Sequence, residues 1–237
     1  MTEQRRSQGR FVLLFGATGT AGSGVLQACL EDPTVSEVRA ITRRPLGASH
    51  PKLREVIWKD FAHFEGIAEE FRGVDCCLFC LGTSARNVAG EDAYREIHVA
   101  YPLAAARALL AESPSAAFVY LSGFLTKRGS WMMWARVKAE AEDALATLGF
   151  LRHANVRPTG VLPMHPEGAE RWLLAPLARV FPSLTIDRVE LGRAMLRLGL
   201  DNAWDGSHTL ESSELKAIAR GAPLPAATKG EPHASAS

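Results

Sequence analysis

A glycine-rich turn between two apolar stretches constrains the fold of this chain more than any other feature of its sequence. Phe11–Phe15 is a short, wholly apolar run, as expected of a strand buried on both faces. The turn Gly16–Gly22 (GATGTAG) follows it, and helix-compatible sequence then continues to Glu31. Val35–Thr42 has the apolar character of a second strand. This order predicts a β-α-β unit at the start of the chain.

The spacing of the three glycines in this turn suits a dinucleotide. Gly16 permits a tight turn off the strand, Gly19 lets the backbone approach a pyrophosphate, and Gly22 lets the helix pack closely. Unpaired N–H groups at the helix N-terminus attract the phosphates. An ordinary glycine-rich turn of an α/β protein is the alternative. The cofactor-binding residues expected in the turn are Gly16, Thr18, Gly19, Thr20 and Ala21.

Two arginines, Arg43 and Arg44, end the second predicted strand. NAD sites commonly place an acidic residue about 20 residues after the glycine turn, where it accepts hydrogen bonds from the ribose hydroxyls. No acid stands at this point of the chain, and guanidinium groups suit a 2′-phosphate instead. The sequence therefore favours NADPH over NADH, with a solvated basic loop as the alternative.

Two further strand ends are expected to contact the same cofactor. Asp60 and Phe61 close the third predicted strand, where the carboxylate suits the adenine amino group and the ring suits the adenine face. A strand-ending Asp without a ligand is the alternative. Leu81, Gly82 and Thr83 close the fourth predicted strand, and Gly82 lets the backbone lie against the ribose and pyrophosphate.

Strands and helices alternate as far as Pro158, which predicts an α/β fold with a doubly wound parallel sheet, the Rossmann fold. We expect one domain over residues 10–220, with a flexible tail at 1–9 and a disordered tail at 221–237. Residues 158–205 are expected to form a small C-terminal lobe over the carboxyl ends of the strands, on the substrate side. The later expected strands are Leu53–Trp58, Val74–Leu81, Ala116–Leu121, Phe150–Val156 and Ser207–Leu210, and the expected helices are Phe64–Phe71, Glu91–Ala111, Trp131–Leu148, Arg171–Phe181, Val189–Leu200 and Glu211–Arg220.

Composition argues against several classes of function. The 237 residues carry a formal net charge of +1, which gives no electrostatic basis for binding nucleic acid. No apolar run approaches the roughly 20 residues of a membrane span, and the N-terminus lacks the apolar region of a signal peptide. We therefore expect a cytoplasmic protein, monomeric or dimeric, whose partner is a small-molecule substrate.

The four cysteines are expected to be buried, reduced thiols rather than metal ligands or disulfides. Cys77 and Cys80 have CxxC spacing, but the alternation of a strand points them to opposite faces. No second pair of ligands follows at zinc spacing, so no metal site is expected.

Several motifs together resemble the atypical short-chain dehydrogenase/reductases. They are the GATGTAG turn, the TRR that ends the second strand, KDF, CLGT, the strand ending LS, a helix containing VKAEAE and the strand ending VRP. Within that superfamily the chain looks most like the TAT-interacting-protein-like branch of NAD(P)-binding, epimerase/dehydratase-like oxidoreductases. The similarity covers about Phe11–Pro158. It implies a Rossmann fold and a nicotinamide cofactor, usually NADPH in this branch.

The resemblance also implies a catalytic Ser, Tyr and Lys, with Tyr and Lys spaced YxxxK on one helix. There, Tyr protonates the carbonyl oxygen as hydride arrives, Lys binds the ribose and lowers the pKa of Tyr, and Ser polarises the carbonyl. Lys138 and Ser122 match two of these positions, but Trp134 stands at the Tyr position and Gly123 replaces a second serine. An indole cannot deliver a proton near neutral pH.

Two hypotheses for the function follow, and a third is weaker. The first is an NADPH-dependent oxidoreductase that acts on a small carbonyl or alcohol, with Trp134 at the Tyr position. The alternative is a non-catalytic NADPH-binding redox sensor or scaffold, which Trp134 favours. An epimerase or dehydratase is the third, although those chemistries also usually need the tyrosine. We assign the missing acid to none of His98, Tyr101, Tyr120 and His165.

The run Trp131–Trp134 (WMMW) is the last feature with functional implications. Four large apolar residues in a row cannot all face the core from one helix. Some of them are expected to line an apolar ligand pocket or a partner surface. Packing beneath the C-terminal lobe is the alternative.

Overall fold

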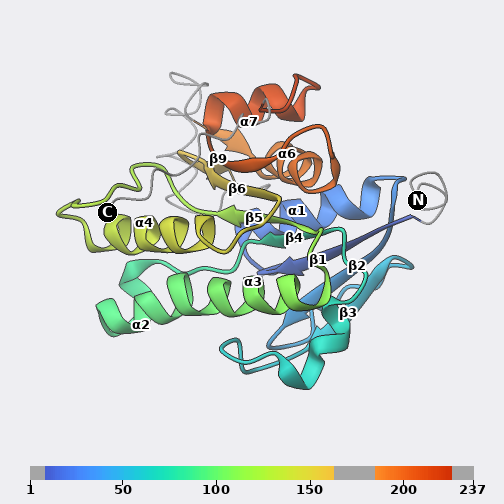
Figure 1. The fold of residues 1–237 in the computed structure, drawn as a ribbon, viewed down its shortest axis with the longest axis horizontal. Helices are drawn as coiled ribbons and strands as arrows, with labels where there is room; N and C mark the ends of the chain where they lie inside the picture. Colours follow the sequence, from blue (N-terminus) through green and yellow to red (C-terminus); the bar gives the residue numbers. More distant parts are fainter. Residues whose placement is uncertain (1–8, 163–184, 226–237) are drawn as a thin grey trace, which may run out of the picture.

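The computed structural model describes residues 9–162 and 185–225 of the chain. Seven parallel strands form one sheet in the order β3-β2-β1-β4-β5-β6-β9 (Figure 1). The doubly wound α/β fold predicted from the sequence is confirmed. The strands are β1 (Arg10–Phe15), β2 (Val35–Thr42), β3 (Leu53–Ile57), β4 (Cys76–Phe79), β5 (Ala117–Leu121), β6 (Arg152–Arg157) and β9 (Gly206–Glu211), and β7 (Val161–Leu162) pairs with β8 (Ile186–Asp187) in a small second sheet.

Helices cover both faces of the large sheet (Figure 1). On one face lie α1 (Thr20–Glu31), α6 (Arg188–Leu200) and α7 (Ser212–Ala219), whose apolar side chains share a core with Val12 and Leu14 of β1. The alternate β1 residues Leu13 and Phe15 belong to the core on the opposite face. That face is covered by α3 (Tyr101–Glu112) and α4 (Met133–Ala146), with the short segments η1 (Glu65–Phe71), η2 (Ala85–Asn87), α2 (Glu91–Arg95) and η3 (Glu96–Ala100) beside them.

The expected long helix from Glu91 is divided by the π-helical segment η3. Pro102 lies in the first turn of α3 and has no N–H to give to the carbonyl of His98, four residues earlier. That carbonyl instead accepts a hydrogen bond from the hydroxyl of Tyr120 at 3.1 Å. The proline therefore shifts the helical register and turns one backbone acceptor toward the sheet.

Helix α6 packs on α1 through backbone contact between glycines. A Cβ on Gly24 would lie 2.2 Å from the carbonyl oxygen of Arg188, and one on Gly192 would lie 2.5 Å from that of Gly24. Residues 188–200 of the expected lobe thus pack on α1 and share the core on that face of the sheet. The expected helix Arg171–Phe181 and His165 lie outside the described residues. At the other boundary, Ala222 N donates to Ala217 O, beyond the expected end of the domain at residue 220.

The four cysteines are free and buried. Cys77 belongs to the core on the α3/α4 face and Cys80 to the core on the α1/α6 face, as the strand alternation predicted. The part of the chain that the structure describes contains no group of three or more His, Cys, Asp or Glu placed to hold a metal ion. None of its helices is both long and apolar enough to cross a bilayer.

Candidate functional site

The structure explains in three different ways why each of these three positions in the turn after β1 is a glycine. Gly16 has a φ of 79°, which L-residues rarely adopt, and a Cβ there would lie 2.6 Å from the backbone of Cys80. A Cβ on Gly22 would lie 2.0 Å from the carbonyl oxygen of Gly16. A Cβ on Gly19, in contrast, would meet no atom of the chain closer than 3.5 Å. The chain itself therefore requires Gly16 and Gly22, whereas Gly19 keeps open a space that the protein does not fill.

The N-terminus of α1 borders this open space. No side chain caps it, and no acidic residue lies in its first turn. Its N–H groups and partial positive charge are thus available to an anion. This arrangement fits the pyrophosphate of a dinucleotide.

A cavity of about 330 Å³ joins the turn to the ends of the neighbouring strands. Arg43 and Arg44 after β2, Phe61 after β3 and Leu81 after β4 line it together with the turn. The structure therefore brings together residues that the sequence predicted separately. Both arginine residues are exposed, and within residues 9–162 and 185–225 their guanidinium groups make no hydrogen bond or ion pair.

Asp60 has local partners at the end of β3. Its Oδ2 lies 3.0 Å from Nδ1 of His63, and its Oδ1 accepts from the N–H of Ala62 at 3.0 Å. The hydrogen bond from His63 lowers the pKa of the Asp60 carboxyl, and that from Ala62 contributes. Phe61 is buried against Phe15. These contacts give Asp60 a role in the turn, and its contact with adenine stays a prediction.

Residue 82 is a glycine because a buried histidine occupies the space that a side chain would need. A Cβ on Gly82 would lie 2.9 Å from Cε1 of His98, so the missing side chain makes room for the imidazole. Nε2 of His98 lies within hydrogen-bond distance of both Thr83 N (3.2 Å) and Thr83 O (3.1 Å), and Tyr94 stacks on the ring at 4.0 Å. Burial and the charge of Lys138 lower the pKa of His98 to about 4, so the ring is neutral. Its Nδ1 is buried without a partner among the described residues.

Ser122 and Lys138 meet at the end of β5. Nζ of Lys138 donates to the carbonyl oxygen of Ser122 at 3.0 Å, and the hydroxyl of Ser122 lies 3.2 Å from that of Thr126. Burial lowers the pKa of Lys138 to about 8, against an opposing effect of the Glu142 charge. Trp134 lies one turn before Lys138 on α4 and is partly buried against the core, whereas Trp131 is 89% exposed. The WMMW run is thus divided between core and surface, as its sequence required.

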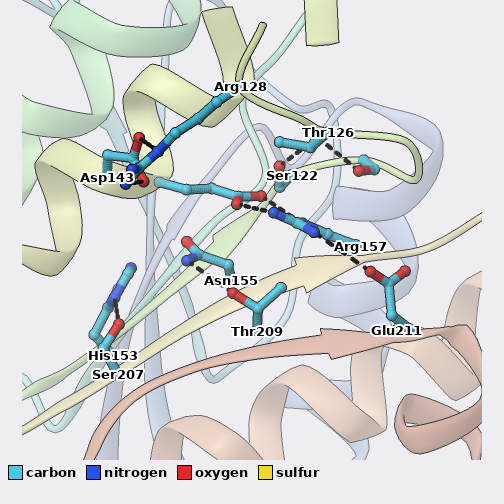
Figure 2. Close-up of polar contacts among 12 residues, drawn as sticks. Ser122, Thr126, Arg128, Asp143, His153, Asn155, Arg157, Ser207, Thr209 and Glu211 are labelled. Carbon is cyan, nitrogen blue, oxygen red and sulfur yellow. Dashed lines mark hydrogen bonds and ion pairs between the residues drawn. The ribbon is translucent and has the colours of Figure 1, made fainter. Parts of the chain in front are cut away.

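Ion pairs that involve Arg157 and Arg128 flank this part of α4 and were not predicted from the sequence (Figure 2). Glu142 is buried and accepts two hydrogen bonds from Arg157 of β6. Arg157 also reaches Glu211 of β9 at 3.5 Å (Figure 2). Asp143 pairs with Arg128 on the exposed side. The buried pair joins residues of α4 and β6 that lie fifteen positions apart, so no local pattern in the sequence indicated it.

The fold is that of a Rossmann protein, and the site combines a glycine turn between β1 and α1 with a Ser and a Lys at β5 and α4, as the resemblance to the short-chain dehydrogenase/reductases implied. Among known proteins, the chain is similar to Protein HTATIP2 of Rattus norvegicus, 28% identical over 226 residues that cover 92% of this chain and 91% of the rat protein. It is also 28% identical over 152 residues to the fmp52 protein of Aspergillus clavatus, covering 62% of this chain and 64% of that protein. No protein-family model matches the chain.

Solved structures share the fold at low sequence identity. A short-chain dehydrogenase/reductase family oxidoreductase from Burkholderia thailandensis superposes with a TM-score of 0.66 at 18% identity, covering 90% of this chain and 94% of that one. Uronate dehydrogenase from Agrobacterium tumefaciens has a TM-score of 0.67 at 14% identity, over 86% and 76% of the two chains. The HTATIP2 similarity confirms the resemblance inferred from the sequence motifs, and these solved structures confirm the fold.

The relatives correct one expectation. The chain was expected to be cytoplasmic, but the fmp52 relatives from several fungi are named mitochondrial proteins. The expectation that the protein is cytoplasmic is therefore wrong. It rested on the absence of an apolar signal region, which excludes only one class of targeting segment.

Proposed function

We propose that this protein is an NADPH-binding oxidoreductase acting on a small carbonyl or alcohol substrate. The observation that carries the proposal is the 330 Å³ cavity in which Arg43 and Arg44 share one space with the glycine turn. Two guanidinium groups that make no hydrogen bond or ion pair with the described residues suit a 2′-phosphate, which accepts bidentate hydrogen bonds. MoeE5, a solved structure of the same fold, carries NAD together with UDP-glucose.

When bound, the reduced dinucleotide supplies a hydride to the carbonyl carbon. The chain's own residues would hold and orient the reactants: the turn and the uncapped N-terminus of α1 would receive the pyrophosphate, and Lys138, hydrogen-bonded to the Ser122 carbonyl, would contact the ribose. Ser122 places a buried hydroxyl at the end of β5, where it suits the carbonyl oxygen of a substrate.

A non-catalytic NADPH-binding sensor or scaffold is the second candidate, and Trp134 is the observation that favours it. A carbonyl panel with NADPH discriminates between the two. Turnover of any carbonyl supports the oxidoreductase, and tight NADPH binding without turnover supports the sensor.

Substitution of either arginine by alanine should reduce the preference for NADPH over NADH. We expect Arg43→Ala and Arg44→Ala each to weaken NADPH binding by roughly tenfold or more, because each removes a charge-assisted hydrogen bond. NADH binding should stay almost unchanged, since NADH lacks the 2′-phosphate. Fluorescence titration with both cofactors measures this, and Arg107→Ala, an exposed arginine of α3 away from the cavity, is the control. Wild-type protein that binds NADH more tightly than NADPH would contradict the assignment.

Trp134→Tyr should raise reductase activity by about tenfold or more, because it restores a phenolic acid one turn from Lys138, and positioned acids contribute roughly 10²–10⁴-fold. The measurement is NADPH oxidation with the carbonyl panel. Trp131→Tyr is the matched control: Trp131 lies two residues before the start of α4 and is 89% exposed, so its substitution should not affect turnover. Lower activity of Trp134→Tyr than of an active wild type would mean that the indole itself belongs to the working site.

A further inference from the structure

None of the tyrosines of the chain is suited to replace the catalytic tyrosine that is missing at position 134. The chain has three tyrosines, and burial raises the pKa of each hydroxyl, to about 12 for Tyr94. Tyr120 is fully buried with its hydroxyl donated to the His98 carbonyl, and Tyr101 donates to Glu96 at 2.9 Å beside Phe61. None of the three holds a phenolic proton that is both labile near neutral pH and free for a substrate.

Among the residues that the structure describes, the other polar and titratable side chains near the ends of β4 and β5 are equally unsuited. His98 is neutral, since burial and the nearby ammonium group lower its pKa to about 4, and a neutral imidazole is a very weak acid. Burial raises the pKa of the Cys80 thiol to about 12. Ser122 has an ordinary hydroxyl that accepts or donates a hydrogen bond with Thr126.

We propose that Lys138 is itself the catalytic acid, giving a proton from Nζ directly to the carbonyl oxygen of the substrate. Among the described residues, only one of its three N–H bonds has a hydrogen-bond acceptor, the Ser122 carbonyl at 3.0 Å. Gly123 borders the ammonium, and a Cβ there would lie 3.6 Å from Nζ, so the absent side chain leaves room beside it. The inference rests on the proposed reductase function and names the residue that completes it.

The charges around Lys138 support an acid that works near neutral pH. In the described ranges, the charge that acts on its pKa is that of Glu142 from α4, which is paired with Arg157, whereas His98 from η3 is neutral. Burial is the dominant effect and brings the pKa of the ammonium to about 8. At pH 7 the group is mostly protonated, yet it gives up its proton far more readily than an exposed lysine.

The proposed step balances without another co-reactant. The carbonyl carbon gains a hydride, with two electrons, from the reduced nicotinamide, which is oxidised. The carbonyl oxygen forms an O–H bond as an N–H bond of Lys138 breaks, so the product is an alcohol and Lys138 becomes a neutral amine. Lys138 is partly exposed, and solvent returns its proton.

Lys138→Arg separates proton donation from charge. A guanidinium keeps the positive charge but does not release a proton, since its pKa lies above about 12. We expect NADPH affinity within about threefold of wild type and a loss of turnover of at least about 100-fold. Lys127→Met, an exposed lysine of the loop between β5 and α4, should leave both unchanged.

Two further measurements do not depend on the arginine variant. Ethylamine should restore turnover to Lys138→Ala, whereas tetramethylammonium, which has the charge but no N–H, should not. In the unliganded wild type, the nitrogen-15 signal of the Lys138 ammonium should titrate near pH 8, and kcat/KM should fall as the pH rises through that value because the acid form is lost.

Wild-type activity in Lys138→Arg, or equal rescue by ethylamine and tetramethylammonium, would overturn the assignment of Lys138 and leave the reductase function intact. Absence of turnover by the wild type with every carbonyl, while NADPH binds, would overturn both.

Discussion

Gly22→Ala should destabilise the protein and abolish dinucleotide binding. The new methyl group would lie 2.0 Å from the carbonyl oxygen and 2.7 Å from the carbonyl carbon of Gly16, both backbone atoms. Relief requires α1 to move away from β1, which opens the turn. Overpacking of this kind costs about 3 kcal/mol or more, and the better helix propensity of Ala returns only about 1 kcal/mol. Thermal unfolding should show a melting temperature lower by roughly 5 °C or more.

Gly19→Ala is the matched control in the same turn. Its Cβ would lie no closer than 3.5 Å to the chain, in ordinary van der Waals contact, so the melting temperature should stay near that of wild type. The methyl group would nevertheless enter the space beside the N-terminus of α1, and NADPH binding should be lost. Two alanines three residues apart thus separate folding from binding. Normal stability of Gly22→Ala, or normal NADPH affinity of Gly19→Ala, would contradict this division.

This turn is also where the sequence was most informative about the fold. Its glycines are required by local geometry: Gly16 has a positive φ, and Gly16 contacts Gly22, six residues later. Because these requirements act over a few residues, they can be recognised from the spacing of the glycines in the sequence. The strand β2 likewise begins and ends where its apolar pattern does. The π-helical segment η3 was harder to predict from the sequence. Pro102 indicated a break in the helix, but it did not indicate which group would donate a hydrogen bond to the freed carbonyl of His98.

The candidate site was predicted in part for the same reason. Arg43 and Arg44 follow a strand end at a recognisable distance from the turn, so their place beside it follows from parallel topology. Gly82 was predicted to lie against the cofactor, which stays a prediction, and the structure gives it a different neighbour, the imidazole of His98, which lies sixteen residues further along the chain. The contact of Glu142 with Arg157 depends on how α4 lies against β6, which no local pattern encodes.

Glu142→Gln should destabilise the fold by roughly 3 kcal/mol, because it leaves the Arg157 guanidinium without its buried carboxylate. The side chain of Glu142 is only 6% exposed, and it accepts from both Nε and Nη2 of Arg157. Glu211, at 3.5 Å and 44% exposed, is a weak substitute. Chemical denaturation should show a lower midpoint with an unchanged slope.

The adjacent residue of α4 supplies the control for this prediction (Figure 2). Asp143 pairs bidentately with Arg128, but these side chains are 42% and 79% exposed, so Asp143→Asn should cost only about 0–1 kcal/mol. The two substitutions are on the same helix, both replace a carboxylate by an amide, and both break a bidentate pair with arginine. They differ mainly in how deeply the ion pair is buried. Glu142→Gln should also lower the pKa of Lys138 further, since the Glu142 charge raises it. Equal losses from the two substitutions would mean that the Glu142 pair, despite its burial, stabilises no more than a surface ion pair.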